Sequence, residues 1–206
     1  MIDSEAQARD YIFERAGADA IERLERLQVS LSDESRRQNL ISASSLDAIW
    51  VRHFADSAQS LDFVPRGTQP WVDFGAGAGF PGLALAIMQP DTTVRLIESR
   101  RRRIDWLQFA VKSLDLQNVR IEGKRAETVA TFDAGVITAR AFAPLPKLLD
   151  LCARFSTAAT YWVLPKGRGA AQELQMLESR RADLFHVEQS LTDRDAQILV
   201  GKGKIR

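Results

Sequence analysis

From residue 71 onward, short apolar runs alternate with longer segments that carry apolar residues at helical spacing. The short runs predict strands and the longer amphipathic segments predict helices. The predicted strands cover residues 71–74, 93–97, 118–122, 134–138, 159–164, about 184–190 and 196–200. The predicted helices cover residues 81–88, 100–115, 144–154 and 168–180. This alternation indicates an α/β fold with a mostly parallel sheet that helices cover on both faces.

The last two predicted strands depart from this alternation. The interval between them has no room for a helix, so we expect them to pair as a hairpin. The sheet should therefore contain seven strands, and its last strand should run antiparallel to its neighbours.

Before residue 67 the pattern is helical. Apolar residues recur at spacings of three and four, at Ile21, Leu24, Leu27 and Leu31. A later helix over Leu46–Ser57 can be capped by Ser44 or Ser45.

Proline and glycine residues between 65 and 70 then predict a linker. We therefore divide the chain into a helical N-terminal cap, residues 1–66, and an α/β core, residues 67–206. The length of 206 residues fits one compact unit.

Composition narrows the function classes. The only cysteine, Cys152, lies in an apolar helical segment, where we expect a small core residue rather than a disulfide or a cysteine metal cluster. With only two histidines, His53 and His186, no metal site is expected. The polar, acidic first residues and the lack of long apolar runs predict a cytoplasmic protein without membrane contact.

The segment 71–82 carries the most chemical information. An apolar run ends in Asp73 and is followed by glycines, as expected of a strand, a tight turn and a helix start near a ligand. The glycines are Gly75, Gly77, Gly79 and Gly82. A turn without a ligand and a dinucleotide site both remain alternatives, because the last three glycines also satisfy the dinucleotide fingerprint.

Two acids flank this loop, and the first of them favours a different ligand. Asp73 would repel a pyrophosphate and attract an ammonium group, whereas Glu98, which ends the next predicted strand, can accept hydrogen bonds from a ribose diol. S-adenosylmethionine (SAM) has an ammonium group, a sulfonium and a ribose but no phosphate. Dinucleotide sites share the second acid, so Asp73 alone discriminates between the two ligands, and the pair together suits SAM.

Positive charge is concentrated although the net charge is only +1. Residues 95–125 contain nine basic and four acidic residues, and such local surplus is the footprint of phosphate binding. The run Arg100, Arg101, Arg102 and Arg103 opens a helix, where cations oppose the macrodipole. A solvated basic face, or neutralisation of Glu98 and Asp105, is the alternative interpretation.

Further polar residues follow later predicted strands, at the edge where a ligand crevice is expected. Arg140 can pair with a carboxylate or a phosphate through two nitrogens. The backbone of Ala126 and the side chain of Glu127 are expected near an adenine, although Glu127 also suits an ordinary helix start. Basic residues follow four successive strands, at Arg102, Arg125, Arg140 and Lys166.

His53 and Asp56 share one face of an N-terminal helix. A histidine and a carboxylate at this spacing can act in catalysis, but a packing or docking role is the interpretation we favour.

The chain resembles the bacterial 16S ribosomal RNA guanine-N7 methyltransferase family RsmG, also called GidB. The resemblance runs from about Asn39 to Lys166. It rests on Asn39-Leu40, Arg52-His53 with Asp56-Ser57, the loop Val72–Gly82, Glu98-Ser99 with Arg102-Arg103, Arg125-Ala126-Glu127 and Arg140-Ala141-Phe142-Ala143. The sequence departs from the family at Ala196, where an arginine is usual.

The resemblance implies a class I SAM-dependent methyltransferase, a Rossmann-like fold with a helical N-terminal cap. Together with the glycine loop it assigns SAM binding to Asp73, Gly75, Gly77, Gly79, Phe80, Glu98, Ala126, Glu127 and Arg140. It implies that Arg125 and Arg140 are needed for activity, through positioning and electrostatics. RNA phosphates would be held by Arg100, Arg101, Arg102, Arg103, Arg125 and Lys166.

The expected reaction needs no general base, because guanine N7 already exposes a lone pair. The expected partner is 16S rRNA, the small ribosomal subunit or an assembly intermediate, and the expected state is a monomer. Two alternatives remain open: a SAM-dependent methyltransferase acting on a small molecule or a protein, and a non-catalytic RNA-binding or assembly module with a vestigial SAM pocket.

Overall fold

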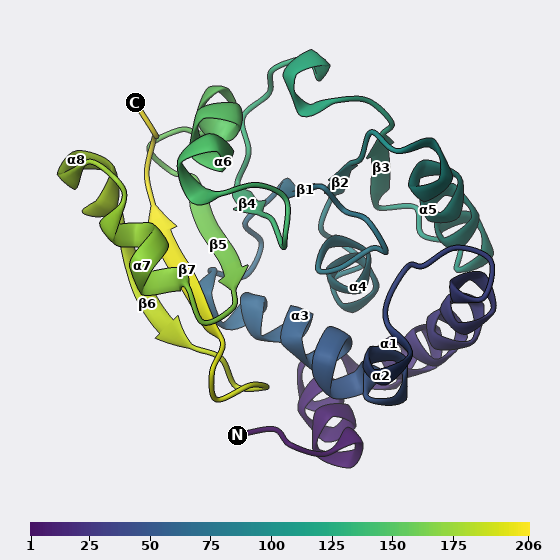
Figure 1. Ribbon diagram of the computed structural model, residues 1–206. Helices are drawn as coiled ribbons and strands as arrows, with labels where there is room; N and C mark the ends of the chain where they lie inside the picture. The colour runs from purple at the N-terminus through teal and green to yellow at the C-terminus, as the bar shows by residue number, and fades with distance from the viewer.

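The computed structural model describes residues 1–206 as a central sheet with helices on both faces (Figure 1). Seven strands lie in the order β3-β2-β1-β4-β5-β7-β6. They are β1 Trp71–Phe74, β2 Val94–Ile97, β3 Val119–Glu122, β4 Val136–Thr138, β5 Tyr161–Lys166, β6 Phe185–Gln189 and β7 Gln197–Lys202. Strand β7 runs antiparallel to both β5 and β6, and the other pairs are parallel. The mostly parallel sheet with an antiparallel last strand is thus confirmed.

At least one helix follows each strand from β1 to β5, and β6 leads directly into β7. The α-helices are α1 Glu5–Ser35, α2 Ala43–Asp47, α3 Asp56–Ala58, α4 Gly82–Met88, α5 Arg101–Ser113, α6 Leu145–Cys152, α7 Ala170–Gln175 and α8 Ser179–Ala182. Residues Trp50–Ala55 form a π-helix, η1, and the 3₁₀-helices are η2 Gln59–Phe63, η3 Ala126–Thr128 and η4 Ala153–Phe155.

Two predicted helices differ from the structure. The segment 168–180 forms two short helices, α7 and α8, because Glu178 adopts an extended backbone and starts the second one. The helix expected over Leu46–Ser57 is a short α2 followed by the π-helix η1. Its cap is Ser42, whose hydroxyl accepts the backbone N–H of Ser45 at 3.1 Å.

Two apolar clusters cover the two faces of the sheet. The first cluster packs α1, η1, α4 and α5 against β1 and β2, and the second packs α6 and α7 against β4 and β5. Cys152 is fully buried in the second cluster, as predicted for a small core residue. Burial raises the pKa of its thiol, which keeps it in the unreactive neutral form.

The helical N-terminal segment shares its core with the sheet. Leu24, Leu27 and Leu31 are fully buried in the same cluster as the apolar residues of α4. The carboxylate of Glu5 accepts the backbone N–H groups of Trp50 at 3.1 Å and Val51 at 3.0 Å, which fixes η1 against α1. The helices lack the combination of length and apolar character that crossing a membrane requires.

Candidate functional site

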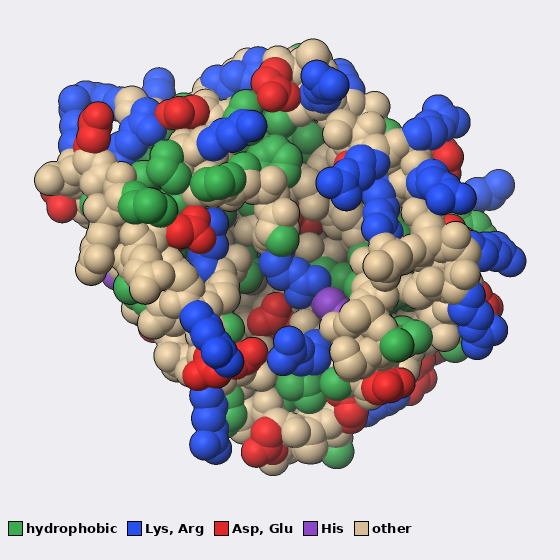
Figure 2. All heavy atoms as spheres, viewed as in Figure 1, with side chains coloured by type: hydrophobic (Ala, Val, Ile, Leu, Met, Phe, Trp, Pro, Cys, Tyr) green, Lys and Arg blue, Asp and Glu red, His purple; other side chains and the backbone are tan.

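Two adjoining cavities lie at the carboxyl ends of the parallel strands. The smaller, of about 350 Å³, is lined by the glycine loop and by residues that follow β2 and β3. The larger, of about 740 Å³, lies between η1, the loop after β4, the end of β5 and the β6–β7 connection. Figure 2 shows a hollow in this face where basic, acidic and histidine side chains meet. Both cavities share Arg140, Ala141 and Phe142.

The glycine loop turns through backbone conformations that other residues rarely adopt. Gly75, Gly77 and Gly79 have φ angles of +73°, +55° and +106°. A Cβ atom on Gly75 would lie 2.5 Å from Cδ2 of Phe142, so this position is also sterically closed. Gly75 and Gly77 line the smaller cavity, whereas Gly79 lies outside its lining and serves the turn into α4.

Asp73 lies beneath the glycine loop rather than in the cavity lining. Its side chain is fully buried, and its Oδ2 accepts the backbone N–H of Gly82 at 2.9 Å. Its Oδ1 is buried without a hydrogen-bond partner. Burial raises the pKa of this carboxyl to about 7. The predicted direct contact with a cationic ligand stays a prediction; the contact present in the structure is with the loop itself.

Glu98 connects β2 to the glycine loop and lines the smaller cavity. Its Oε1 accepts the N–H groups of Ser99 at 2.7 Å and Arg100 at 2.8 Å, and its Oε2 accepts that of Gly77 at 3.0 Å. Oε2 retains one acceptor site, since a carboxylate oxygen can accept two hydrogen bonds. This buried carboxylate beside a glycine loop fits the ribose of SAM.

The segment after β3 contributes unequally to the smaller cavity. Ala126, for which SAM binding is predicted, lines it, and so does Lys124, for which no role was predicted. Arg125 and Glu127 are exposed and belong to neither lining; Arg125 has an extended backbone just before η3, and Glu127 lies within η3. Their predicted roles in activity and in adenine binding stay predictions.

The predicted arginine run divides between the cavity and the surface. Arg100 and Arg103 line the smaller cavity, and Arg103 donates a hydrogen bond to the backbone oxygen of Asn39. Partial burial, with the charge of Arg100, lowers the pKa of Arg103. Arg101 and Arg102 are exposed on α5, and Arg101 pairs with Asp105 at 3.0 Å.

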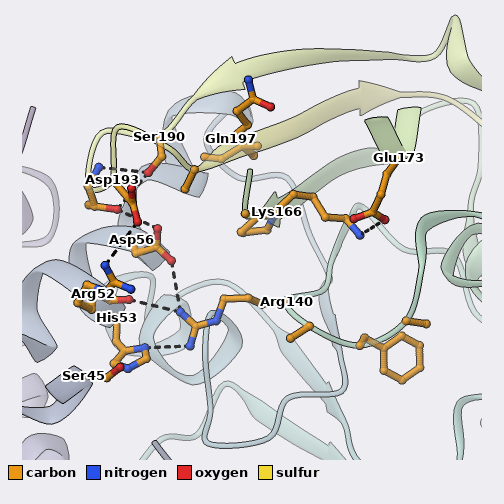
Figure 3. A pocket seen from close by; sticks show the side chains of 18 of the residues that line it. Ser45, Arg52, His53, Asp56, Arg140, Lys166, Glu173, Ser190, Asp193 and Gln197 are labelled. Atoms are coloured by element: carbon orange, nitrogen blue, oxygen red, sulfur yellow. Dashed lines mark hydrogen bonds and ion pairs between the residues drawn. The ribbon is translucent and has the colours of Figure 1, made fainter. Parts of the chain in front are cut away.

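Arg140 lies at the junction of the two cavities and contacts three residues around η1 (Figure 3). One terminal nitrogen lies 2.8 Å from Nδ1 of His53. The other lies 3.3 Å from Oδ2 of Asp56 and 3.4 Å from the backbone oxygen of Arg52. Both residues of the His53–Asp56 pair noted in the sequence therefore contact the guanidinium of Arg140.

His53 is buried between the guanidinium and the glycine loop. Its ring stacks on Phe80 with centroids 4.6 Å apart and an interplanar angle of 17°. Phe80, for which SAM binding is predicted, lines the smaller cavity. Burial, assisted by the charges of Arg140 and Arg52, lowers the pKa of His53 to about 3. Its imidazole is therefore neutral at physiological pH.

The larger cavity also contains an ion pair. Nζ of Lys166 lies 2.9 Å from Oε2 of Glu173, which also accepts the backbone N–H of Leu145 at 2.9 Å. Lys166, predicted to hold a phosphate, is thus already paired with a carboxylate. Sequence reasoning missed Glu173 and Asp193, since α7 and the β6–β7 connection bring them in without a local signal.

Comparisons with known proteins agree with this geometry. A family model described as "GidB: rRNA small subunit methyltransferase G" matches residues 20–198. The chain is 55% identical over 206 residues to ribosomal RNA small subunit methyltransferase G of Erythrobacter litoralis, covering 100% of both chains. It is 47% identical over 203 residues to the protein of the same name from Novosphingobium aromaticivorans, covering 97% of this chain and 88% of the relative.

Solved structures of low sequence identity share the fold. A SAM-dependent methyltransferase from Aquifex aeolicus aligns with a TM-score of 0.58 and 17% identity, over 82% of this chain and 96% of that one. A mutant of MtNAS in complex with S-adenosylmethionine aligns with a TM-score of 0.54 and 14% identity, over 97% of this chain and 77% of that one. The predicted class I methyltransferase fold is confirmed.

Proposed function

The chain belongs to the GidB family of rRNA small subunit methyltransferases G, and from that premise we propose that it methylates N7 of a guanine in 16S rRNA. It is a SAM-dependent methyltransferase, and its substrate class is ribosomal RNA. The family resemblance drawn from the sequence is confirmed. Beyond the family assignment, the proposal names the methylated base, guanine, and the methylated atom, N7.

The observation that carries the proposal is the junction of the two cavities at Arg140. The smaller cavity has the glycine loop and Glu98 expected of a SAM site. The larger cavity is wide enough for a nucleobase, and it opens beside the first. Arg140 belongs to both linings, which supports a guanidinium that would contact groups on either side of the methyl transfer.

The chemistry at this junction requires positioning rather than proton removal. When bound, SAM supplies a methyl group whose bond to sulfur breaks as a bond to guanine N7 forms, without loss of a proton. The nearest imidazole agrees with this, because Nδ1 of His53 is occupied by Arg140. The larger cavity is lined by three carboxylates, and each is already paired with a cation: Asp56 with Arg140, Glu173 with Lys166 and Asp193 with Arg52.

The exposed basic residues provide the proposed RNA contact. Arg101 and Arg102 extend from α5 near the smaller cavity, and Arg125 is exposed on the neighbouring loop. Cations in these positions would hold phosphates and make binding strongly dependent on salt. We propose that the chain acts as a monomer in the cytoplasm, on the small subunit or on an assembly intermediate.

The test maps N7-methylguanine in small-subunit rRNA by borohydride–aniline cleavage, in cells with and without the gene. A cleavage site that disappears with the gene is the expected result, and an unchanged pattern would refute the proposal. Calorimetry with SAM separates the enzyme from a vestigial binding module. RNA affinity that falls steeply with salt separates an RNA substrate from a small molecule or protein.

A further inference from the structure

The contacts of Arg140 define a role for the His53–Asp56 pair. A guanidinium has several N–H donors and no acceptor, so its orientation is fixed by the acceptors around it. Here those acceptors are Nδ1 of His53, Oδ2 of Asp56 and the backbone oxygen of Arg52. All three come from one short stretch around the π-helix η1.

We propose that His53 is a positioning residue for methyl transfer: its neutral imidazole, protonated on Nε2, accepts a hydrogen bond from Arg140 and holds that guanidinium between the two cavities. The inference rests on the proposed function for its catalytic consequence. The hydrogen-bond arrangement itself is a property of the protein without RNA.

The tautomer follows from the partner. Because Arg140 can only donate, Nδ1 of His53 must carry a lone pair, and the ring proton must lie on Nε2. A protonated ring would set an N–H against the guanidinium. The facing carboxylates are already engaged, Asp56 with Arg140 and Asp193 with Arg52. The lowered pKa of His53 agrees with a ring that stays neutral.

The network is rigid because its second acceptor is itself held. Oδ1 of Asp56 accepts the amide of Gln59 at 2.8 Å and the hydroxyl of Thr192 at 2.9 Å. The ring of His53 stacks on Phe80 of the glycine loop. The guanidinium of Arg140 is therefore fixed by the N-terminal helices, the glycine loop and the β6–β7 connection together. A fixed guanidinium keeps the reacting groups aligned, and small misalignments of such groups slow a reaction strongly.

Packing alone is the competing explanation, and two substitutions separate it from positioning. His53→Phe keeps an aromatic ring for Phe80 but removes the acceptor. His53→Asn places its Oδ1 near the position of Nδ1 but removes the ring. If the hydrogen bond matters, H53F lowers kcat roughly 10–100-fold at saturating SAM and RNA, and H53N rescues most of that loss. His186→Phe, on the exposed surface of β6, is the control.

A second measurement needs no RNA. Nitrogen-15 NMR of the unliganded protein should show His53 as the Nε2–H tautomer at pH 7, with an Nδ1 signal that shifts in Arg140→Met. An Nδ1–H tautomer or an imidazolium would overturn the inference, as would H53F being more active than H53N. If wild-type protein methylates no small-subunit RNA, the proposed function fails while the NMR result still decides the hydrogen bond.

Discussion

The buried carboxylate of Asp73 accepts the backbone N–H of Gly82 at 2.9 Å, which joins the end of β1 to the first turn of α4. The hydrogen bond closes the glycine loop from below, because the two residues are its two ends. Helix starts have backbone N–H groups without intrahelical partners, and here a buried side chain satisfies one. The shape of the smaller cavity therefore depends on a residue outside its lining.

Substitution of Asp73 should reveal this structural role. Asp73→Ala removes the acceptor and leaves a buried N–H unpaired, so the free energy of unfolding should fall by about 1–3 kcal/mol. Asp73→Asn retains an acceptor oxygen and should stay closer to the wild type. Urea denaturation measures both at pH 4, where the buried carboxyl of the folded protein is neutral and the cost of its ionisation does not enter. Equal losses in the two variants would contradict the proposed hydrogen-bond role.

Two buried groups should give opposing pH dependences of stability. The pKa of His53 falls from 6.5 to about 3 on folding, so stability is lost as pH drops below 6.5. The pKa of Asp73 rises from 3.8 to about 7, so stability is lost as pH rises above 3.8. Between these limits each group contributes a slope of up to about 1.4 kcal/mol per pH unit, with opposite signs.

The wild-type contributions of these two groups should therefore largely cancel between about pH 4 and pH 6.5. The free energy of unfolding of Asp73→Asn, minus that of the wild type, should increase with pH. The same difference for His53→Phe should decrease with pH. Urea midpoints at half-unit pH steps measure both slopes. Parallel profiles for the three proteins would show that neither group titrates as described.

A methyl group at Gly75 should close the cofactor cavity. Its Cβ would lie 2.5 Å from Phe142, at a φ of +73°. Gly75→Ala should therefore weaken SAM binding at least tenfold, which corresponds to about 1.4 kcal/mol. Gly67→Ala is the matched control, because Gly67 has a φ of +82° but open space around it. Calorimetry should find SAM affinity unchanged in G67A, and equal weakening in both variants would assign the effect to backbone strain.

Removal of one exposed cation should separate RNA binding from SAM binding. Arg102→Ala should weaken RNA affinity and reduce the slope of log K against log salt by about one, with SAM affinity unchanged. Arg180→Ala is the control, since Arg180 is exposed on α8, far from α5 along the sheet (Figure 1). An unaltered salt slope in R102A would remove Arg102 from the RNA contact.

The parts of the site that sequence reasoning predicted are those with local signals. Strand ends, the glycine loop and Glu98 follow from short-range patterns, and the structure places them at one cavity. The partners of Arg140 carry no such signal, because His53 lies 87 residues away along the chain. The tie between Lys166 and Glu173 depends on where α7 begins, which apolar periodicity does not define.

A second limit came from helix geometry. The spacing of His53 and Asp56 placed them on one face of an α-helix, whereas the segment begins as a π-helix. Both side chains nevertheless contact Arg140, so what residue spacing could not show is the wider turn and the tertiary partner. Glu127 illustrates the same limit, since a single turn of 3₁₀-helix directs its side chain to solvent.

The position of Arg140 in both linings has a thermodynamic consequence. A side chain that contacts two bound molecules makes the affinity for one depend on the presence of the other. Whatever factor RNA imposes on the dissociation constant of SAM, SAM must impose on that of RNA. If each molecule strengthens the binding of the other, the ternary complex of protein, SAM and RNA is favoured. If each weakens the binding of the other, binding of one promotes release of the other, which helps the spent cofactor and the methylated product to leave.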